Sequence, residues 1–559
     1  MPMQMSANEG SFPPLPGRRA RRPLRLAAVT AVLLMAAGGS APLVAQERPI
    51  PVGHELFVGS ELEQYLRLLQ TLGEVAPHQW SVRTFGPAEV ARLRPTGRRH
   101  PWGDRYDFGA VEGVRLVRPD VAVVGNSSVP YGYNDGAVWA GRGVTVAGRV
   151  GVAGRFGPLS ATIAPEFFHA QNADFDLHPA SRPGDQRFAY PGYSNSIDLP
   201  QRFGTGGYGR LTPGQSTVRL DLGGVTAGVS TANQHWGPVW DQPLLLGNNA
   251  EGFPHAFLGT SRPVDLWIGR VHGRAVWGEL RPSAYVAGVE RRRRWMTGLV
   301  ATFSPRGLPG LEVGGGRFFH QVWPSGGVGL DDLLWPFQSL LKEGLAGDGT
   351  DGTDPDNQLA SVFGRWMIPS AGVEVYGEYA REDHNWNLRD LALEPDHNSG
   401  FVVGMARAWR PSADRVLSLR AEVLDTRVTH LARVRSQTPL YRHSRMREGH
   451  THRGQILGAA AGFGGAHARL ALDLYHPRGR WGGALVRSRR LVPPPPGEVV
   501  REGGGEEDVV YSAEVGGRLF LGRFELAGVL APGYEFNRDL GDDRVNVYGR
   551  LEGRVGVGR

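Results

Sequence analysis

The sequence predicts an all-β protein, an antiparallel transmembrane β-barrel that follows a short N-terminal helical module. Three observations support this prediction. Apolar and polar residues alternate with the two-residue period of strands over about 400 residues. No apolar run reaches the roughly 20 residues that a membrane-spanning helix needs. An N-terminal export signal is present. An exported chain that crosses a membrane with strands must close into a barrel, because lipid satisfies no free backbone groups.

The N-terminus has the features of a secretory signal peptide. Five arginines between Arg18 and Arg25 precede the apolar run Leu26–Ala37. The alternative is an uncleaved membrane anchor, but about a dozen apolar residues are short for a span. We expect residues 1–45 to be removed, which lowers the net charge from +7 to +3. Nucleic-acid binding is therefore not indicated.

Residues 46–100 are predicted to form a small helical module. Ser60 and Glu63 form an S-x-x-E capping box, and Gly73 supplies a stop. The apolar residues between them recur at helical spacing: Leu62, Tyr65, Leu66, Leu69 and Leu72. A second short helix is predicted from Pro87 to Leu93, with proline in its first turn. The apolar face of the first helix must pack against another part of the chain.

Residues 101–559 are assigned to the barrel, with clear alternation from about Val144 onward. Val218, Leu220 and Leu222 precede Gly223–Gly224, and alternation resumes at Val225, which predicts a two-residue hairpin. The same period recurs at Val373–Tyr379, Leu417–Val423, Ala468–Leu474 and Val545–Val557.

A soluble β-sandwich would show the same period with its apolar face turned inward. The export signal, the absence of cysteine and the length of the strand-rich region favour a barrel, whose apolar face looks outward and whose charges line the lumen.

One segment combines amide and aromatic side chains. Sugars are bound by this combination, because rings stack on aromatic faces while amides and carboxylates take the hydroxyls. The other interpretation is structural, with the amides satisfying buried backbone groups. The candidate ligand-binding residues here are Asn233, Gln234, His235, Trp236, Trp240, Asn248 and Asn249.

A second candidate group follows a predicted strand: Glu378, Arg381 and Asp383. Paired carboxylates serve glycoside hydrolysis, but arginine–glutamate networks are ordinary in a polar lumen, so we assign these residues to ligand binding and none to catalysis. His443, His450 and His452 lie among arginines, which favours an anion-attracting patch over a metal site. Neither a nucleophile elbow nor a phosphate-binding loop is present. We expect no enzyme, metal or cofactor.

Several segments resemble the Wzi type of capsule-assembly outer-membrane proteins. The most specific is NQHWGPVWDQPLLLGNNAEGFPHAFLGTS at 233–261, and four others are similar: QWSVRTFGPAEVARL at 79–93, PYGYNDGAVWAGRG at 130–143, DNQLASVFGRWMIPSAGVEVYGEYARED at 356–383 and GHTHRGQILGAAAGFG at 449–464. The resemblance implies an 18-stranded outer-membrane barrel with a periplasmic helical module. It also implies a lectin-like role in retaining exported polysaccharide on the cell.

The expected partners are a capsular or other surface polysaccharide, outer-membrane lipid and lipopolysaccharide, with the protein a monomer. Three alternatives remain open: an outer-membrane porin, an outer-membrane hydrolase and a soluble periplasmic β-protein.

Overall fold

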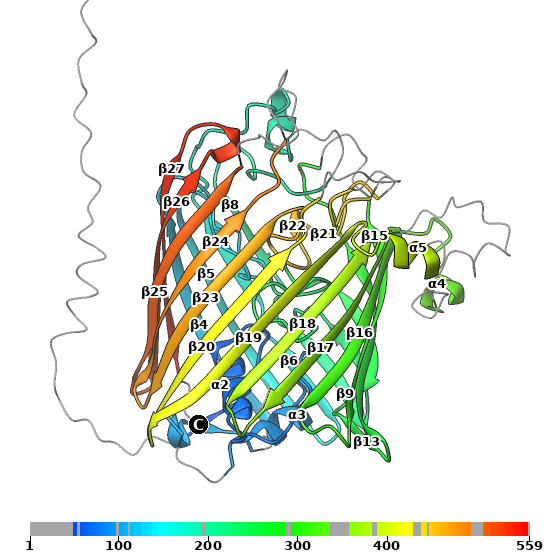
Figure 1. Cartoon of the computed structure of the whole chain (residues 1–559), viewed down its shortest axis with the longest axis vertical. Helices are drawn as coiled ribbons and strands as arrows, with labels where there is room; N and C mark the ends of the chain where they lie inside the picture. Colours follow the sequence, from blue (N-terminus) through cyan, green and yellow to red (C-terminus); the bar gives the residue numbers. More distant parts are fainter. Residues whose placement is uncertain are drawn as a thin grey trace, which may run out of the picture. The chain divides into compact units, whose positions relative to one another are not determined.

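The described residues form a closed antiparallel β-barrel of 18 strands, shown in Figure 1. The structure is a computed structural model that describes residues 49–52, 56–96, 100–109, 112–191, 197–286, 292–334, 357–382, 388–428, 438–443, 446–493 and 507–556. The predicted signal peptide lies outside these residues. Among the residues described, no helix is long and apolar enough to cross a membrane.

Three of the strands are interrupted and consist of two segments each, β6 with β7, β8 with β9, and β12 with β13. The barrel segments are β4 Gly113–Asn126, β5 Gly143–Phe156, β6 Leu159–Ile163, β7 Glu166–Ala170, β8 Tyr208–Thr212, β9 Thr217–Leu222, β10 Val225–Ser230, β12 His255–Thr260, β13 Val264–Leu266, β14 Gly269–Leu280, β15 Arg294–Pro305, β16 Leu311–Val322, β17 Asn357–Ile368, β18 Val373–Glu382, β19 Ser399–Ser412, β20 Arg415–Asp425, β23 Ala466–His476, β24 Gly479–Arg489, β25 Val509–Leu521, β26 Phe524–Phe536 and β27 Arg544–Val555.

The barrel closes between its last and first strands. β27 pairs antiparallel with β4, so that Glu552 lies opposite Ala122. β4 begins at Gly113, well before the clear alternation that starts near Val144. Its register with β5 shifts between Val117 and Asp120. This bulge interrupts the two-residue period, and the strand was therefore hard to recognise from sequence.

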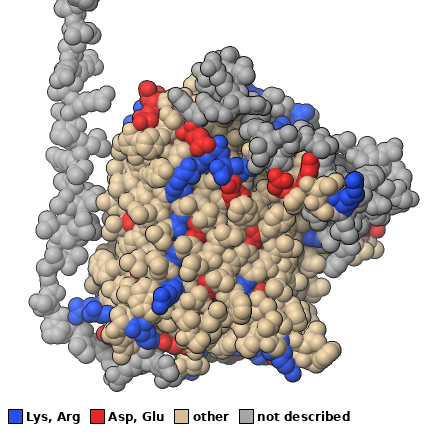
Figure 2. Space-filling view, in the orientation of Figure 1, with Lys and Arg blue, Asp and Glu red and all other residues tan. Residues whose placement is uncertain are grey.

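The predicted orientation of the two strand faces is confirmed. In β18, Glu374 and Glu378 are 0% and 3% exposed, whereas Val375 between them is 41% exposed. In β9, Leu220 is exposed while its neighbour Arg219 is buried. Uncharged residues make up most of the wall visible in Figure 2, and a group of charges lies near the upper end. A stacked sandwich would bury the apolar face instead, so that alternative is wrong.

The two ends of the barrel differ in their connections. One end carries tight turns, including the predicted hairpin in which Leu222 pairs with Val225 and both Gly223 and Gly224 have positive φ, as a type I′ turn requires. The other end carries long connections, among them residues 171–207, 231–254 and 426–465. We call these the short-turn end and the long-loop end. Short elements between or beside the barrel strands near the long-loop end are η3 Gly184–Phe188, α4 Leu330–Leu334, α5 Leu388–Leu393, β21 Thr451–His452, β22 Gln455–Ile456 and η7 Arg538–Leu540.

The N-terminal module lies inside the barrel toward the short-turn end (Figure 1). Ser60 caps α2 by accepting from the Glu63 amide, and the Glu63 carboxylate accepts from the Gly59 amide rather than from Ser60. The apolar face of α2 packs against Ala408, Val416 and Tyr475 of the wall. The module consists of β1 Ile50–Pro51, α2 Glu61–Thr71, β2 Val82–Arg83, α3 Pro87–Val90, η1 Ala91–Leu93, η2 Gly103–Arg105 and β3 Tyr106–Asp107.

Charged pairs fix the module to the wall. Glu61 pairs with Arg480 and Arg518, and Arg67 pairs with Glu374. One further wall carboxylate binds the module backbone: Glu312 accepts from the amides of Trp80 and Ser81. These contacts reach strands on several sides of the lumen, so the module is held as a plug.

Candidate functional site

Residues 231–254 leave the wall after β10 and fold into the lumen. Within this segment, β11 (His235–Trp236) pairs antiparallel with β2 of the module. Val239 and Leu244–Leu246 then pack with Tyr441 and Leu457 from the 426–465 connection, together with inward residues of β14 to β20. The centre of the barrel is therefore a packed apolar core, and three chain segments occupy the lumen.

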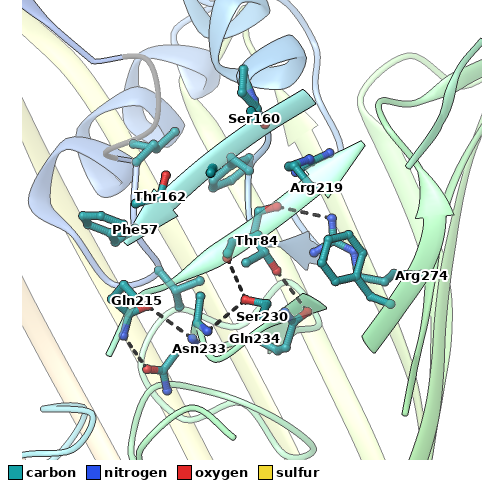
Figure 3. Close-up of a pocket in the computed structure, with 18 residues that line it drawn as sticks. Phe57, Thr84, Ser160, Thr162, Gln215, Arg219, Ser230, Asn233, Gln234 and Arg274 are labelled. Carbon is teal, nitrogen blue, oxygen red and sulfur yellow. Dashed lines mark hydrogen bonds between the residues drawn. The ribbon is translucent and has the colours of Figure 1, made fainter. Parts of the chain in front are cut away.

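The first two predicted ligand-binding residues, Asn233 and Gln234, line a small internal pocket (Figure 3). Asn233 exchanges hydrogen bonds with Gln215 and donates to the Ala250 carbonyl at 2.8 Å. Gln234 accepts from the Thr84 hydroxyl at 2.9 Å. The pocket measures about 50 Å³, which is room for water rather than for a sugar ring.

The next two predicted residues, His235 and Trp236, are buried. The His235 Nε2 atom lies 3.0 Å from the Val239 carbonyl, which closes the turn after β11. Trp236 is 0% exposed, and its ring meets Phe318 edge to face with centroids 6.4 Å apart. Both side chains hold residues 231–254, which we call the in-folded segment, against the module and the wall.

Trp240 is half-buried and lies between two guanidinium groups. Arg67 and Arg420 lie 4.3 and 4.6 Å from its ring centroid, and the indole nitrogen donates to Glu374 at 2.8 Å. Cations over an indole ring are attracted by its negative face. The following turn is fixed by Glu422, which accepts from the backbone amides of residues 240–242.

The second predicted group does not form one cluster. Glu378 accepts from the Leu244 amide at 3.1 Å, and Arg381 donates to the Glu394 carbonyl at 2.9 Å. Asp383 lies outside the described residues. Glu378 thus supports the in-folded segment, and Arg381 supports a connection at the long-loop end.

The remaining predicted residues lie near the long-loop end. Asn248 donates to the Asn134 carbonyl at 2.8 Å, and Asn249 donates to the Ile456 carbonyl at 2.9 Å. Asn249 also lines a cavity of about 330 Å³, which we call the rim cavity. This volume falls within the usual range of small-molecule sites.

The rim cavity combines the side-chain types that recognise sugars. Its lining includes half-buried aromatic residues, amides and charges: Tyr131, Tyr133, Trp139, Tyr190, Gln201, Asn249, Gln455, Arg489, Arg490, Arg538 and Asp539. Trp139 meets Phe203 edge to face at 5.0 Å, and the Tyr190 hydroxyl donates to the Leu491 carbonyl at 2.7 Å. The aromatic rings are thus held in place while part of each surface stays accessible.

Most of this lining was not among the predicted site residues. Tyr131, Tyr133 and Trp139 come from the segment PYGYNDGAVW, which the sequence analysis used only as a point of resemblance. The local signal was present, since aromatic residues stand on both sides of Asn134 and Asp135 in a connection between strands. Their approach to residues 454–463 depends on the tertiary fold.

His450 of the 426–465 connection serves packing. The His450 ring stacks on Tyr441 with centroids 5.2 Å apart, and its Nε2 atom lies 2.6 Å from the Leu245 carbonyl. Burial lowers the pKa of His450 to about 4, so the ring is neutral near pH 7. Across the described part of the chain, no group of three or more His, Cys, Asp or Glu residues is arranged to hold a metal ion.

Comparisons with known proteins find one family and several barrels. The family described as capsule assembly protein Wzi matches residues 118–474. The structure of Wzi from Escherichia coli is 14% identical with a TM-score of 0.58, and the match covers 90% of this chain and 99% of that chain. That protein is described as a carbohydrate-binding outer-membrane β-barrel involved in group 1 capsule assembly.

Two other barrels are more distant. A BenF-like porin from Pseudomonas fluorescens is 8% identical with a TM-score of 0.39, covering 79% of this chain and 99% of its own. OccAB2 from Acinetobacter baumannii is 7% identical with a TM-score of 0.38, covering 78% and 97%. The comparison with curated proteins finds no match.

Proposed function

The chain belongs to the Wzi capsule assembly protein family, and on this premise we propose that it is a monomeric outer-membrane protein that binds surface polysaccharide at the rim cavity. The cavity carries the proposal, because it places aromatic faces, amides and arginines around one space of about 330 Å³. We expect a capsular or related glycan to be held there without being cleaved.

The orientation in the membrane follows from the connections. Outer-membrane barrels have short periplasmic turns and longer extracellular loops. The long-loop end therefore faces the cell exterior, and the N-terminal module faces the periplasm. This orientation presents the rim cavity to polysaccharide outside the cell.

The predicted residues take two roles in this proposal. Asn249 contacts the glycan directly, whereas Asn233, Gln234, His235, Trp236 and Trp240 position the in-folded segment that carries it. Asn248 fixes the Asn134 backbone at 2.8 Å, next to the aromatic residues of the cavity. Glu378 supports the same segment through Leu244.

The test is a glycan-retention assay. A deletion strain is compared with its parent and with strains that carry Trp139→Ala or, as a matched control, Trp267→Ala. Trp267 is 85% exposed in a turn at the opposite end. We expect polysaccharide to be released from the deletion and Trp139→Ala strains but retained by the control. Full retention in the deletion strain would refute the proposed function.

A binding measurement tests whether the glycan binds in the rim cavity. With the purified barrel and the released glycan, we expect Trp139→Ala to weaken binding about tenfold, or about 1.4 kcal/mol. Equal affinity of Trp139→Ala and the parent protein would place the glycan elsewhere on the surface.

A further inference from the structure

A second concave surface lies on the outside of the wall. It measures about 460 Å³, and we call it the wall groove. Apolar side chains make up most of its exposed lining, and polar residues complete it: Ser216, Thr217, Ser230, Thr231, His255 and Glu279. Its principal lining residues are Val218, Val229, Ala256, Trp277, Trp295 and Trp323.

The groove lies where two neighbouring wall strands, β10 and β12, are short on the side of the long-loop end. β10 ends at Ser230 and β12 begins at His255, since the chain between them folds into the lumen. The neighbouring β14 continues to Leu280. Among the described strands, β8 pairs only with β7. No described strand therefore lies between β8 and the part of β14 nearest the long-loop end.

The strand register places the apolar residues of the groove in one row. Val218 lies opposite Val229, and Ala256 lies opposite Trp277. Val218 and Val229 are 39% and 58% exposed and are continuous with the apolar wall. A groove on the lipid-facing side of a barrel is filled by hydrocarbon rather than by water.

The end of the groove nearest the long loops is aromatic and then positively charged. The rings of Trp295 and Trp323 meet edge to face at 5.4 Å, and the Arg293 guanidinium lies 4.6 Å from the Trp323 centroid. Arg281 and Arg293 are 48% and 55% exposed, and both pair with Glu279. Two exposed guanidinium groups thus share one carboxylate near the indole rings.

We propose that the wall groove binds one molecule of lipopolysaccharide, with an acyl chain along the apolar row and a lipid A phosphate on Arg281 and Arg293. Tryptophan rings favour the boundary between hydrocarbon and head groups, and guanidinium groups bind phosphate in a fork geometry. The groove opens toward the long-loop end, where the outer leaflet carries lipopolysaccharide. The inference rests on the outer-membrane location proposed above but not on polysaccharide binding.

The experiment measures lipid retention by the full-length barrel. The protein is purified in mild detergent, incubated with lipid A or with phosphatidylglycerol, and analysed by native mass spectrometry. The variant Ala256→Phe fills the groove, and Ala513→Phe makes the same change at an exposed wall position on β25. We expect one lipid A on the parent protein and on Ala513→Phe, and at least a tenfold lower bound fraction on Ala256→Phe.

A second variant tests the head-group contacts. Replacing Arg281 and Arg293 together with alanine should lower the lipid A fraction at least fivefold while the barrel still migrates as a folded species in unheated gels. Equal retention by Ala256→Phe and Ala513→Phe would overturn the groove as the site. Equal retention of phosphatidylglycerol and lipid A by the parent protein would overturn lipopolysaccharide as the ligand. Glycan binding by the folded variants, measured in parallel, reports separately on the proposed function.

Discussion

Arg67 of the module donates to Glu374 of the wall at 2.6 Å, and the two side chains are 1% and 0% exposed. Glu374 also pairs with Arg365 at 2.6 Å and accepts from Trp240. One buried carboxylate thus joins the module, the wall and the in-folded segment.

Replacing Glu374 with alanine should loosen this junction strongly. Two buried guanidinium groups would each lose an ion-pair partner, and breaking a buried pair typically costs about 3–5 kcal/mol. We expect the module to become sensitive to protease at denaturant concentrations where the parent protein resists. The control is Glu112→Ala, whose carboxylate is 59% exposed beside Arg155 and should have little effect. Unchanged protection in Glu374→Ala would contradict the role assigned to this residue.

Docking of the module should weaken in acid through Glu61. Burial alone would raise the pKa of Glu61, but Arg480 and Arg518 outweigh it and lower the pKa from 4.5 to about 2. A lowered carboxyl pKa gives stability that is complete above pH 4.5 and is lost as the pH falls toward 2. Its size is about 3 kcal/mol. The measurement is module protection against pepsin between pH 5 and pH 2, where Glu61→Gln should flatten the dependence. A parent protein with no loss over this range would disprove the prediction.

Replacing Trp236 should lower the stability of the protein, whereas replacing Trp139 should lower its affinity for glycan. Trp236→Ala removes a fully buried ring and should cost about 3–5 kcal/mol of unfolding free energy. Trp139 is half-buried in the rim cavity, so its replacement should reduce glycan affinity more than stability. Denaturant unfolding and glycan binding are measured on both variants. The assignment fails if Trp236→Ala binds less glycan while remaining as stable as the parent protein.

The parent barrel should not conduct ions as a general porin does. The module lies in the lumen with an apolar cluster of its own, and residues 231–254 join the described residues 438–443 and 446–465 in a second apolar cluster. In planar bilayers we expect no regular conductance steps at protein amounts that give steps with a reconstituted general porin. Regular steps from the parent protein would revive the porin alternative.

Local patterns were sufficient for the strands but not for the cavity. The hairpin at Gly223–Gly224 and the inward face of β18 follow from neighbouring residues, because strand period and turn chemistry are local. The rim cavity depends on contacts such as Asn249 with Ile456, which are 207 residues apart. A repeating sequence pattern does not indicate that two residues so far apart in the chain lie close together.

The role of the side chains in the in-folded segment also could not be predicted from the local sequence. Its amides and tryptophans were expected to face a ligand or to satisfy backbone groups, and both expectations fit the composition equally well. The choice depends on β11 pairing with β2, which brings residues 235–236 against 82–83. Burial of Trp236 follows from that pairing and could not be derived from the segment alone.

The position of the plug also orders events during biogenesis. Glu61 is made early, yet its partners Arg480 and Arg518 follow 419 and 457 residues later. Contacts so distant along the chain form slowly, because a long loop must close first. The helix that begins at Glu61 can therefore complete these ion pairs only after nearly the whole polypeptide is available.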